Sequence, residues 1–143
     1  MRDFLDDQPL GYLLYRAHNS LRAEVTATVL EPLGLAFPQY ICIRILSKFP
    51  GRSNAELARD TNVSPQAMNM VLRGLEERGL VARPASVSSG RSLPAALTRA
   101  GEELLDKTDA GVRAAEDRLM AKLSDRQRED FIQILMSIGT DPF

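Results

Sequence analysis

Two helix-start signals lie eleven residues apart near the middle of the chain, and they limit the possible fold more than any other feature. Ser53 and Glu56 form an S-x-x-E capping box, in which each side chain satisfies a free amide at a helix start. Ser64 caps a second helix, and Pro65 occupies its first position, where the missing N–H costs nothing. The first helix is therefore short, about Asn54 to Asp60. The pair is predicted to form a helix-turn-helix.

The second of these helices, which ends at Gly79, is amphipathic. The helical step places the Ser64 cap and the apolar residues Met68, Val71 and Leu72 on the same side of the helix as Leu75. The opposite side carries amides, an arginine and a methionine, which can pair with adenine, with guanine and with the thymine methyl group. We predict that this side enters the DNA major groove, although an ordinary solvated face is the alternative for the helix alone. The expected contacts are Ser64, Pro65, Gln66, Asn69, Met70 and Arg73.

The sequence period changes after Gly79 and predicts a β-hairpin. LVARP and LPAAL flank ASVSSGRS, a turn rich in Ser and Gly. A hairpin directly after a helix-turn-helix is a wing, and Arg91 at its tip is suited to the DNA minor groove. Pro84 and Pro94 cannot donate to the strand ladder, so the strands are expected to be short and open at an edge.

Charge is divided unevenly along the chain, whose net charge is −1. Residues 48–99 hold eight Lys and Arg against four Asp and Glu, a net charge of +4, and the rest of the chain carries −5. This division suggests a segment that binds a polyanion, although chance clustering is the alternative. Lys48, Arg52 and Arg59 are expected to contact phosphates, which position a protein without reading sequence.

The segments on either side of this unit are predicted to be helical, because apolar residues recur in them at helical spacing. The expected helices run from about Pro9 to Leu30, from Pro38 to Phe49, from Arg99 to Leu123, and from the Ser124/Gln127 capping box to Gly139. Gly111 is expected to bend the third of these. The predicted fold is mainly α with a small β wing, a winged helix-turn-helix plus a helical dimerisation region.

Several classes of protein are disfavoured. The chain has 143 residues, no run of 18 apolar residues, and acid where a signal peptide carries a basic segment, so we expect a cytoplasmic protein. One Cys and one His allow neither an internal disulfide nor a His/Cys zinc cluster. With no phosphate-binding loop either, we expect no catalytic residue, metal or cofactor, and no enzyme.

The order of these motifs resembles that of the MarR family of bacterial winged-helix transcription regulators, over almost the whole chain. LAFPQYICIRIL looks like the second-helix motif of the family, and NAELARDTNVSPQAMNMVLRGLEERGLVAR looks like its helix-turn-helix. SGRSLPAALTRAG looks like the end of the wing and is the most specific part of the match. Two residues depart from the pattern. Ser89 stands where the family usually has an Asp that helps to hold the wing, and Pro94 lies inside the second wing strand.

The resemblance implies a single MarR-like domain with two parts. Residues from about 36 to 98 would form the DNA-binding lobe, and residues 1–35 and 99–143 the helical dimerisation region. It also implies a homodimer on a pseudo-palindromic operator of double-stranded DNA, associated with the nucleoid. Such a regulator is more often a repressor, released by a small aromatic or phenolic ligand.

The sequence leaves two kinds of regulatory signal possible, a small aromatic ligand and an oxidant. Several aromatic and basic residues of the first two predicted helices could form a pocket with aromatic walls and a cation, which would suit an aromatic carboxylate. Packing within the core or the dimer is the favoured alternative for these residues. Cys42 offers redox sensing as an alternative mechanism, but a Cys among isoleucines is usually an unreactive core residue. A winged helix that docks proteins is a further alternative, which the outward polar set and Arg91 disfavour. The candidate ligand residues are Tyr12, Tyr15, Arg16, His18, Tyr40 and Arg44.

Overall fold

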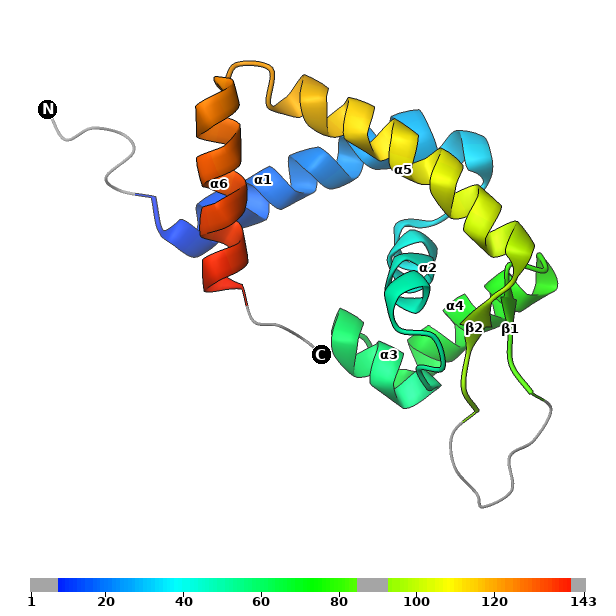
Figure 1. Cartoon of the computed structure of the whole chain (residues 1–143). Coiled ribbons are helices and arrows are strands. Elements are labelled where there is room, and N and C mark those ends of the chain that lie inside the picture. Colours follow the sequence, from blue (N-terminus) through cyan, green and yellow to red (C-terminus); the bar gives the residue numbers. More distant parts are fainter. Residues whose placement is uncertain (1–7, 85–92, 140–143) are drawn as a thin grey trace, which may run out of the picture.

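The computed structural model describes residues 8–84 and 93–139, which form six α-helices and a two-stranded sheet (Figure 1). The helices are α1 (Leu10–Val25), α2 (Phe37–Lys48), α3 (Asn54–Thr61), α4 (Pro65–Glu77), α5 (Arg99–Leu119) and α6 (Asp125–Ile138). The strands are β1 (Val81–Ala82) and β2 (Ala96–Leu97), which pair antiparallel. The predicted fold class is therefore confirmed.

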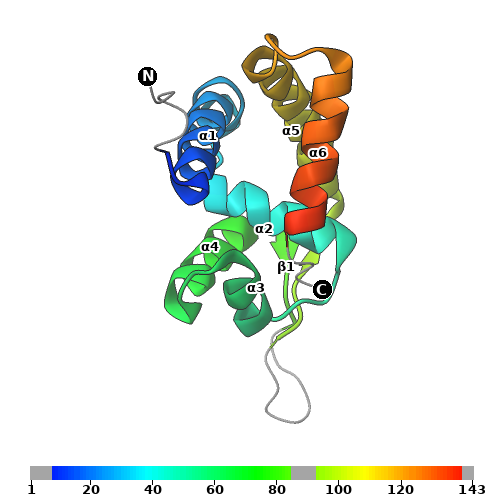
Figure 2. The ribbon, with the colours of Figure 1, turned by 90° about the vertical axis from the view of Figure 1, so that its left-hand side faces the viewer.

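The lower part of the molecule in Figures 1 and 2 is a compact unit of α2, α3, α4 and the sheet. Its core consists of side chains that α2, α3 and α4 direct at one another, including Ile43, Leu46, Leu57, Met68 and Leu72, each at most 1% exposed. Ser53 caps α3 and forms the predicted capping box with Glu56. The helix-turn-helix is thus built by the local signals that predicted it.

The wing is anchored on both edges of its second strand. Val81 pairs with Leu97 and Ala82 with Ala96. On the other edge, the Gly51 N–H donates to the Ala95 carbonyl at 2.8 Å, and the Ala95 N–H donates to the Arg52 carbonyl at 2.9 Å. The expectation of an open edge was wrong for this strand, because the segment before α3 pairs with it.

The pairing of the segment before α3 with this strand edge also explains why Pro94 is tolerated there. Pro94 forms an isolated bridge with Ser53, and the donor of this edge is the following residue, Ala95, which has an N–H. The proline therefore lies where no ladder hydrogen bond is lost. The wing tip, including Ser89 and Arg91, lies outside the described residues.

The upper part contains α1, α5 and α6 (Figure 2). After Val25 the first helix continues as one π-helical turn, Thr26–Leu30, and a 3-10 turn, Glu31–Leu33, and ends at Gly34 with φ of +69°. Gly111 of α5 lies against this π-helical turn, and a Cβ there would stand 2.8 Å from a methyl group of Val29. Gly111 therefore allows two helices to approach closely.

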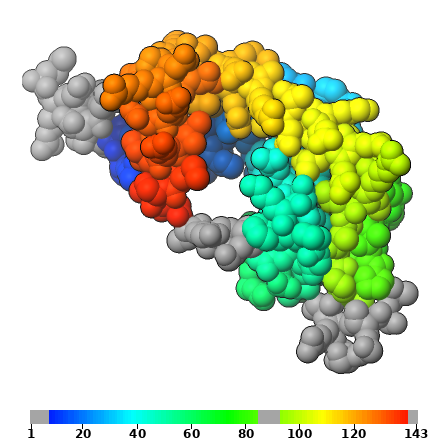
Figure 3. All heavy atoms as spheres, in the orientation of Figure 1, coloured from blue at the N-terminus to red at the C-terminus, as the bar shows by residue number. Residues whose placement is uncertain are grey.

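The last helix, α6, packs loosely on its own chain. It begins with the predicted Ser124/Gln127 capping box, yet none of its 14 residues is fully buried. The helix α5 ends at Leu119, four residues before the predicted end, and Met120–Leu123 form the turn into α6. In the space-filling view, the surface is hollowed between α6 and α2 (Figure 3).

Within the described ranges, no single helix is long and apolar enough to cross a membrane. The stretches Leu10–Leu33 and Phe37–Lys48, bent by 83° where they meet, reach the required length and composition only when taken together.

Candidate nucleic-acid interface

The start of α4 is built to project from the surface. The Ser64 Oγ accepts a hydrogen bond from the Ala67 N–H at 3.1 Å, and Pro65 is the first helical residue. The Asn54 side chain of α3 donates to the Pro65 carbonyl at 3.0 Å, which fixes the start of α4 against its neighbour. Ser64, Pro65 and Gln66 are exposed. The positive end of the α4 dipole therefore faces solvent, where it favours an anion such as a phosphate.

The two faces of α4 have the predicted division. Met68, Leu72 and Leu75 are fully buried. On the opposite side Gln66, Met70 and Arg73 are exposed, with Met70 at 75%, and Asn69 at the border is half-buried. The predicted contacts of α4 thus lie on its free side.

The basic residues near α4 differ in their availability. Lys48, Arg59 and Arg73 are exposed and form no ion pair within the described residues. Arg52 is held inside the lobe, because its guanidinium lies 2.5 Å from a carboxylate oxygen of Glu56 and 3.1 Å from one of Asp60. Lys48, Arg59 and Arg73 are therefore free to contact phosphates. A phosphate contact by Arg52 remains a prediction, and the ion pairs of Arg52 disfavour it.

Cys42 is deep in the core of the lobe, with 0% exposure. Burial raises the pKa of its thiol to about 12, and the nearby charge of Arg83 offsets this only in part. Because the thiolate is the reactive form, Cys42 has the features of an inert core residue.

The six candidate ligand residues do not meet in one place. Tyr12, Tyr15 and Arg16 are exposed on the outer part of α1, where Arg16 lies over the Tyr12 ring at 5.9 Å. Arg44 forms an ion pair with Asp109 of α5 at 2.8 Å. Only His18 and Tyr40 approach a common neighbour, the ring of Phe37, with centroid distances of 6.0 and 6.1 Å.

The Phe37 ring also contacts a cation, Arg22, that is not among the six predicted ligand residues. The Arg22 guanidinium carbon lies 4.8 Å from the centroid of the Phe37 ring, and Arg22 forms no ion pair with any described residue. His18 and Arg22 are four residues apart and so share one face of α1. Burial raises the pKa of Tyr40, so its phenol remains protonated. We call His18, Arg22, Phe37 and Tyr40 the junction cluster.

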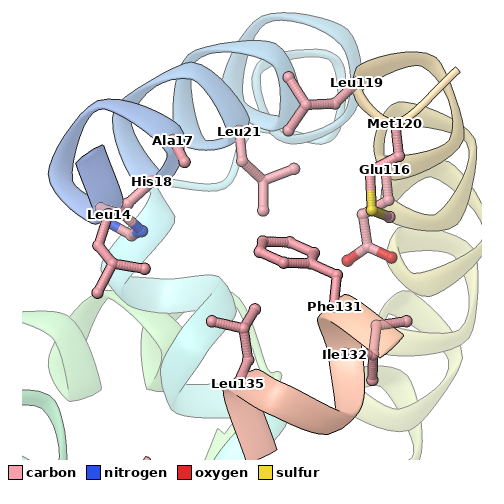
Figure 4. Close-up of a pocket in the computed structure, with 10 residues that line it drawn as sticks. All are labelled: Leu14, Ala17, His18, Leu21, Glu116, Leu119, Met120, Phe131, Ile132 and Leu135. Atoms are coloured by element: carbon pink, nitrogen blue, oxygen red, sulfur yellow. The ribbon is translucent and has the colours of Figure 1, made fainter. Parts of the chain in front are cut away.

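A cavity of about 600 Å³ lies beside this cluster, between α1, α5 and α6 (Figure 4). Its walls are almost entirely apolar, and His18 and Glu116 are their only titratable residues. Phe131 and Leu135 of α6 point across it toward α1. The lining residues are Leu14, Ala17, His18, Leu21, Glu116, Leu119, Met120, Phe131, Ile132 and Leu135.

Comparison with known proteins identifies this arrangement. Residues 33–92 match the MarR family. Over 136 residues the chain is 57% identical to the HTH-type transcriptional repressor Rv2887 of Mycobacterium tuberculosis, a match that covers 95% of this chain and 97% of that protein. This chain belongs to the MarR family.

Solved structures of a MarR family protein extend the match. The crystal structure of M. tuberculosis Rv2887 in complex with salicylic acid is 56% identical, covers 95% of this chain and 100% of that chain, and superposes with a TM-score of 0.79. The structure of Rv2887 in complex with DNA is 50% identical, covers 94% and 100%, and has a TM-score of 0.82. In those structures it is Rv2887 that binds salicylic acid and DNA.

Membership of the MarR family confirms the predicted class, a helix-turn-helix regulator of transcription that binds DNA, and not an enzyme. Sequence reasoning missed Arg22 and Phe37 of the junction cluster. One signal could have found Arg22, since it lies one helical turn after the only His in the chain. The part played by Phe37 depends on a contact between two helices, which no local pattern encodes.

Proposed function

We propose that this MarR family protein is a dimeric repressor whose α4 reads a pseudo-palindromic operator and which an aromatic acid of the salicylate type releases. The main support is the division of α4, with Met68, Leu72 and Leu75 fixed in the core and Gln66, Met70 and Arg73 free. Because the core holds the backbone of α4 rigidly, its free side chains are presented in a defined geometry, as base reading requires.

Other contacts are proposed to position the protein on the duplex. Lys48 and Arg59 would meet phosphates, and Arg91 of the wing would enter the minor groove. The lobe spanning about residues 36–98 would supply these contacts, and residues 1–35 and 99–143 would hold two copies together. A two-fold dimer places its half-sites about one turn, ~10 base pairs, apart. We expect the protein to act in the cytoplasm, on the nucleoid.

The apolar surface of α1 and α6 supports a second copy of the chain as the partner. Leu10 and Tyr15 of α1 are 66% and 63% exposed, and Ile134 and Ile138 of α6 are 56% and 57% exposed. Large apolar side chains that gather on the exposed faces of two helices are typical of a surface that contacts a partner. The surface flanks the 600 Å³ cavity, so apolar side chains from a second copy would fill that space.

The junction cluster is the proposed site for the effector. An aromatic carboxylate needs apolar or aromatic walls and one available cation. Phe37 and Tyr40 supply rings, and Arg22 supplies a guanidinium without a carboxylate partner among the described residues. Arg44 is already paired with Asp109, so it is the weaker candidate.

Binding of the purified protein to the DNA upstream of its own gene tests this function. We expect one protein dimer to bind each operator duplex, with an affinity that falls steeply as salt rises. Salicylate should weaken binding to the operator. A protein that binds this DNA no more tightly than a scrambled duplex would refute the repressor, and binding that salicylate leaves unchanged would refute the effector.

A further inference from the structure

The end of α4 is attached to a distant part of the chain through one arginine. Arg78, the C-cap residue of α4, donates from Nη1 to the Gly34 carbonyl at 2.7 Å and from Nη2 to the Leu33 carbonyl at 2.9 Å. These carbonyls belong to the turn that ends the first helix, 44 and 45 residues earlier in the chain. One side chain therefore joins the DNA-reading helix to the connection between α1 and α2.

The chemistry of the two partners fits this role. The last carbonyls of a helix have no intrahelical donor and carry partial negative charge. Here the Leu30 and Glu31 carbonyls accept from the N–H groups of Leu35 and Gly34. The Leu33 and Gly34 carbonyls accept from Arg78, whose planar guanidinium supplies parallel donors. Arginine thus acts as the C-terminal cap of a helix to which it does not belong.

A second contact lies on the other side of the same connection. A Cβ on Gly74 of α4 would stand 3.0 Å from the side-chain nitrogen of Gln39, in the first turn of α2. The Gln39 side-chain oxygen accepts a hydrogen bond from the Ala36 N–H at 3.0 Å, which closes the start of α2. The end of α4 therefore contacts both sides of the connection, through Arg78 at residues 33 and 34 and through Gly74 at Gln39 of α2.

We propose that Arg78 is a positioning residue for sequence recognition, which fixes the tilt of α4 by attaching its C-terminal end to residues 33 and 34. This inference rests on the proposed DNA-reading function of α4. With 13 residues, α4 is about 20 Å long, so a tilt of about 5° at this end moves its DNA-facing start by about 2 Å. Such a displacement is enough to break bidentate contacts with bases.

Duplex binding separates positioning from a direct phosphate contact. We expect Arg78→Ala to weaken binding to the upstream operator by roughly five- to tenfold, the usual effect of losing charge-assisted hydrogen bonds. Binding to a scrambled duplex and the salt slope should stay unchanged, and Arg78→Lys, which can reach one carbonyl, should recover part of the loss. The matched control is Arg113→Ala, an exposed arginine of α5 without a described contact.

Hydrogen exchange of the DNA-free protein provides a readout that is independent of the operator. Arg78→Ala should speed amide exchange in the second half of α4 and at residues 33–36, and Arg113→Ala should not. Unchanged exchange, or an unchanged preference for the operator, would overturn the proposal. An equal loss on both duplexes with a salt slope lower by about one would show a phosphate contact instead. A wild type without operator preference would refute the proposed function, while exchange would still decide the attachment.

Discussion

Gly101, in the first turn of α5, lies directly against the carbonyl oxygen of Leu80, at the start of the wing. A Cβ built on Gly101 would stand 2.2 Å from that oxygen, and the same carbonyl accepts a hydrogen bond from the Thr98 N–H at 3.1 Å. The neighbour is backbone and not a flexible side chain, so it has little freedom to move away. This contact joins the long helix α5 to the unit formed by α2, α3, α4 and the sheet.

The substitution Gly101→Ala is therefore expected to lower the free energy of unfolding by about 2 kcal/mol or more, because the strand or the helix must shift. Gly11→Ala is the control, since a Cβ at Gly11 would meet nothing within 4 Å. Urea unfolding followed by circular dichroism measures both variants. Equal stability of Gly101→Ala and the wild type would show that this close approach is not rigid.

Glu56 makes the stability of the lobe depend on pH. The hydrogen bond from the Ser53 N–H lowers the pKa of the Glu56 carboxyl, and the Ser53 hydroxyl and Arg52 lower it further. A group whose pKa is lowered by folding stabilises the protein above its ordinary pKa, here 4.5. That contribution is lost as the pH falls through the lowered value.

We expect Glu56→Gln to keep the capping hydrogen bonds but to lose about 1 kcal/mol or less of stability at pH 7. The difference from the wild type should vanish in acid, below the lowered pKa. Glu103→Gln is the control, because its pair with Arg99 is exposed and 3.4 Å long. A difference that is the same at pH 7 and in acid would contradict the assignment.

Cys42 is predicted to take no part in sensing. With its pKa raised to about 12, its thiol stays protonated at neutral pH, and the fully buried sulfur is out of reach of oxidants. Operator binding should be the same before and after treatment with hydrogen peroxide, in the wild type and in Cys42→Ala. Release of the wild type alone by peroxide would favour the redox alternative.

Arg22 is predicted to bind the carboxylate of the effector. Arg22→Gln should raise the salicylate concentration needed for release by about tenfold, the equivalent of one charge-assisted hydrogen bond. Arg16→Gln, on the same helix but beside Tyr12, should respond like the wild type. Isothermal titration of salicylate into each variant gives the comparison, and an effect of Arg16→Gln alone would favour the outer part of α1 as the site.

The exposed face of α6 provides a test of the dimer. Ile134→Lys should yield monomers in sedimentation and weaken operator binding, because a charge would replace apolar contact with the second copy. Glu129→Lys adds the same side chain at an exposed position on the other side of α6 and should remain dimeric. Circular dichroism verifies that both variants are folded. A dimeric Ile134→Lys protein would show that this face of α6 is not the interface.

Local signals predicted the helix starts well because they act over three or four residues. Ser53, Ser64, Thr98 and Ser124 each cap a helix as expected. The end of α5 was placed too late because residues 119–123 contain no Gly or Pro to mark a stop. The remaining differences are contacts between distant segments, for which periodicity carries no signal.

The wing and the site illustrate that limit. The pairing of residues 51–53 with residues 94–95 joins segments more than 40 residues apart, and it explains how Pro94 is tolerated. The junction cluster likewise joins α1 to α2 through the ring of Phe37. The predicted ligand candidates included His18 and Tyr40 of this cluster, together with Arg16 and Arg44, but not Arg22.

Selection of DNA from a randomised pool tests most directly the central claim, that the free side of α4 reads base sequence. The wild type should enrich a palindrome with half-sites about one turn apart. Arg73→Ala should relax the preference at one position in each half-site, at a cost of ~1–3 kcal/mol, without changing the others. Enrichment of no sequence by the wild type, or the same preference in Arg73→Ala at every position, would contradict the account.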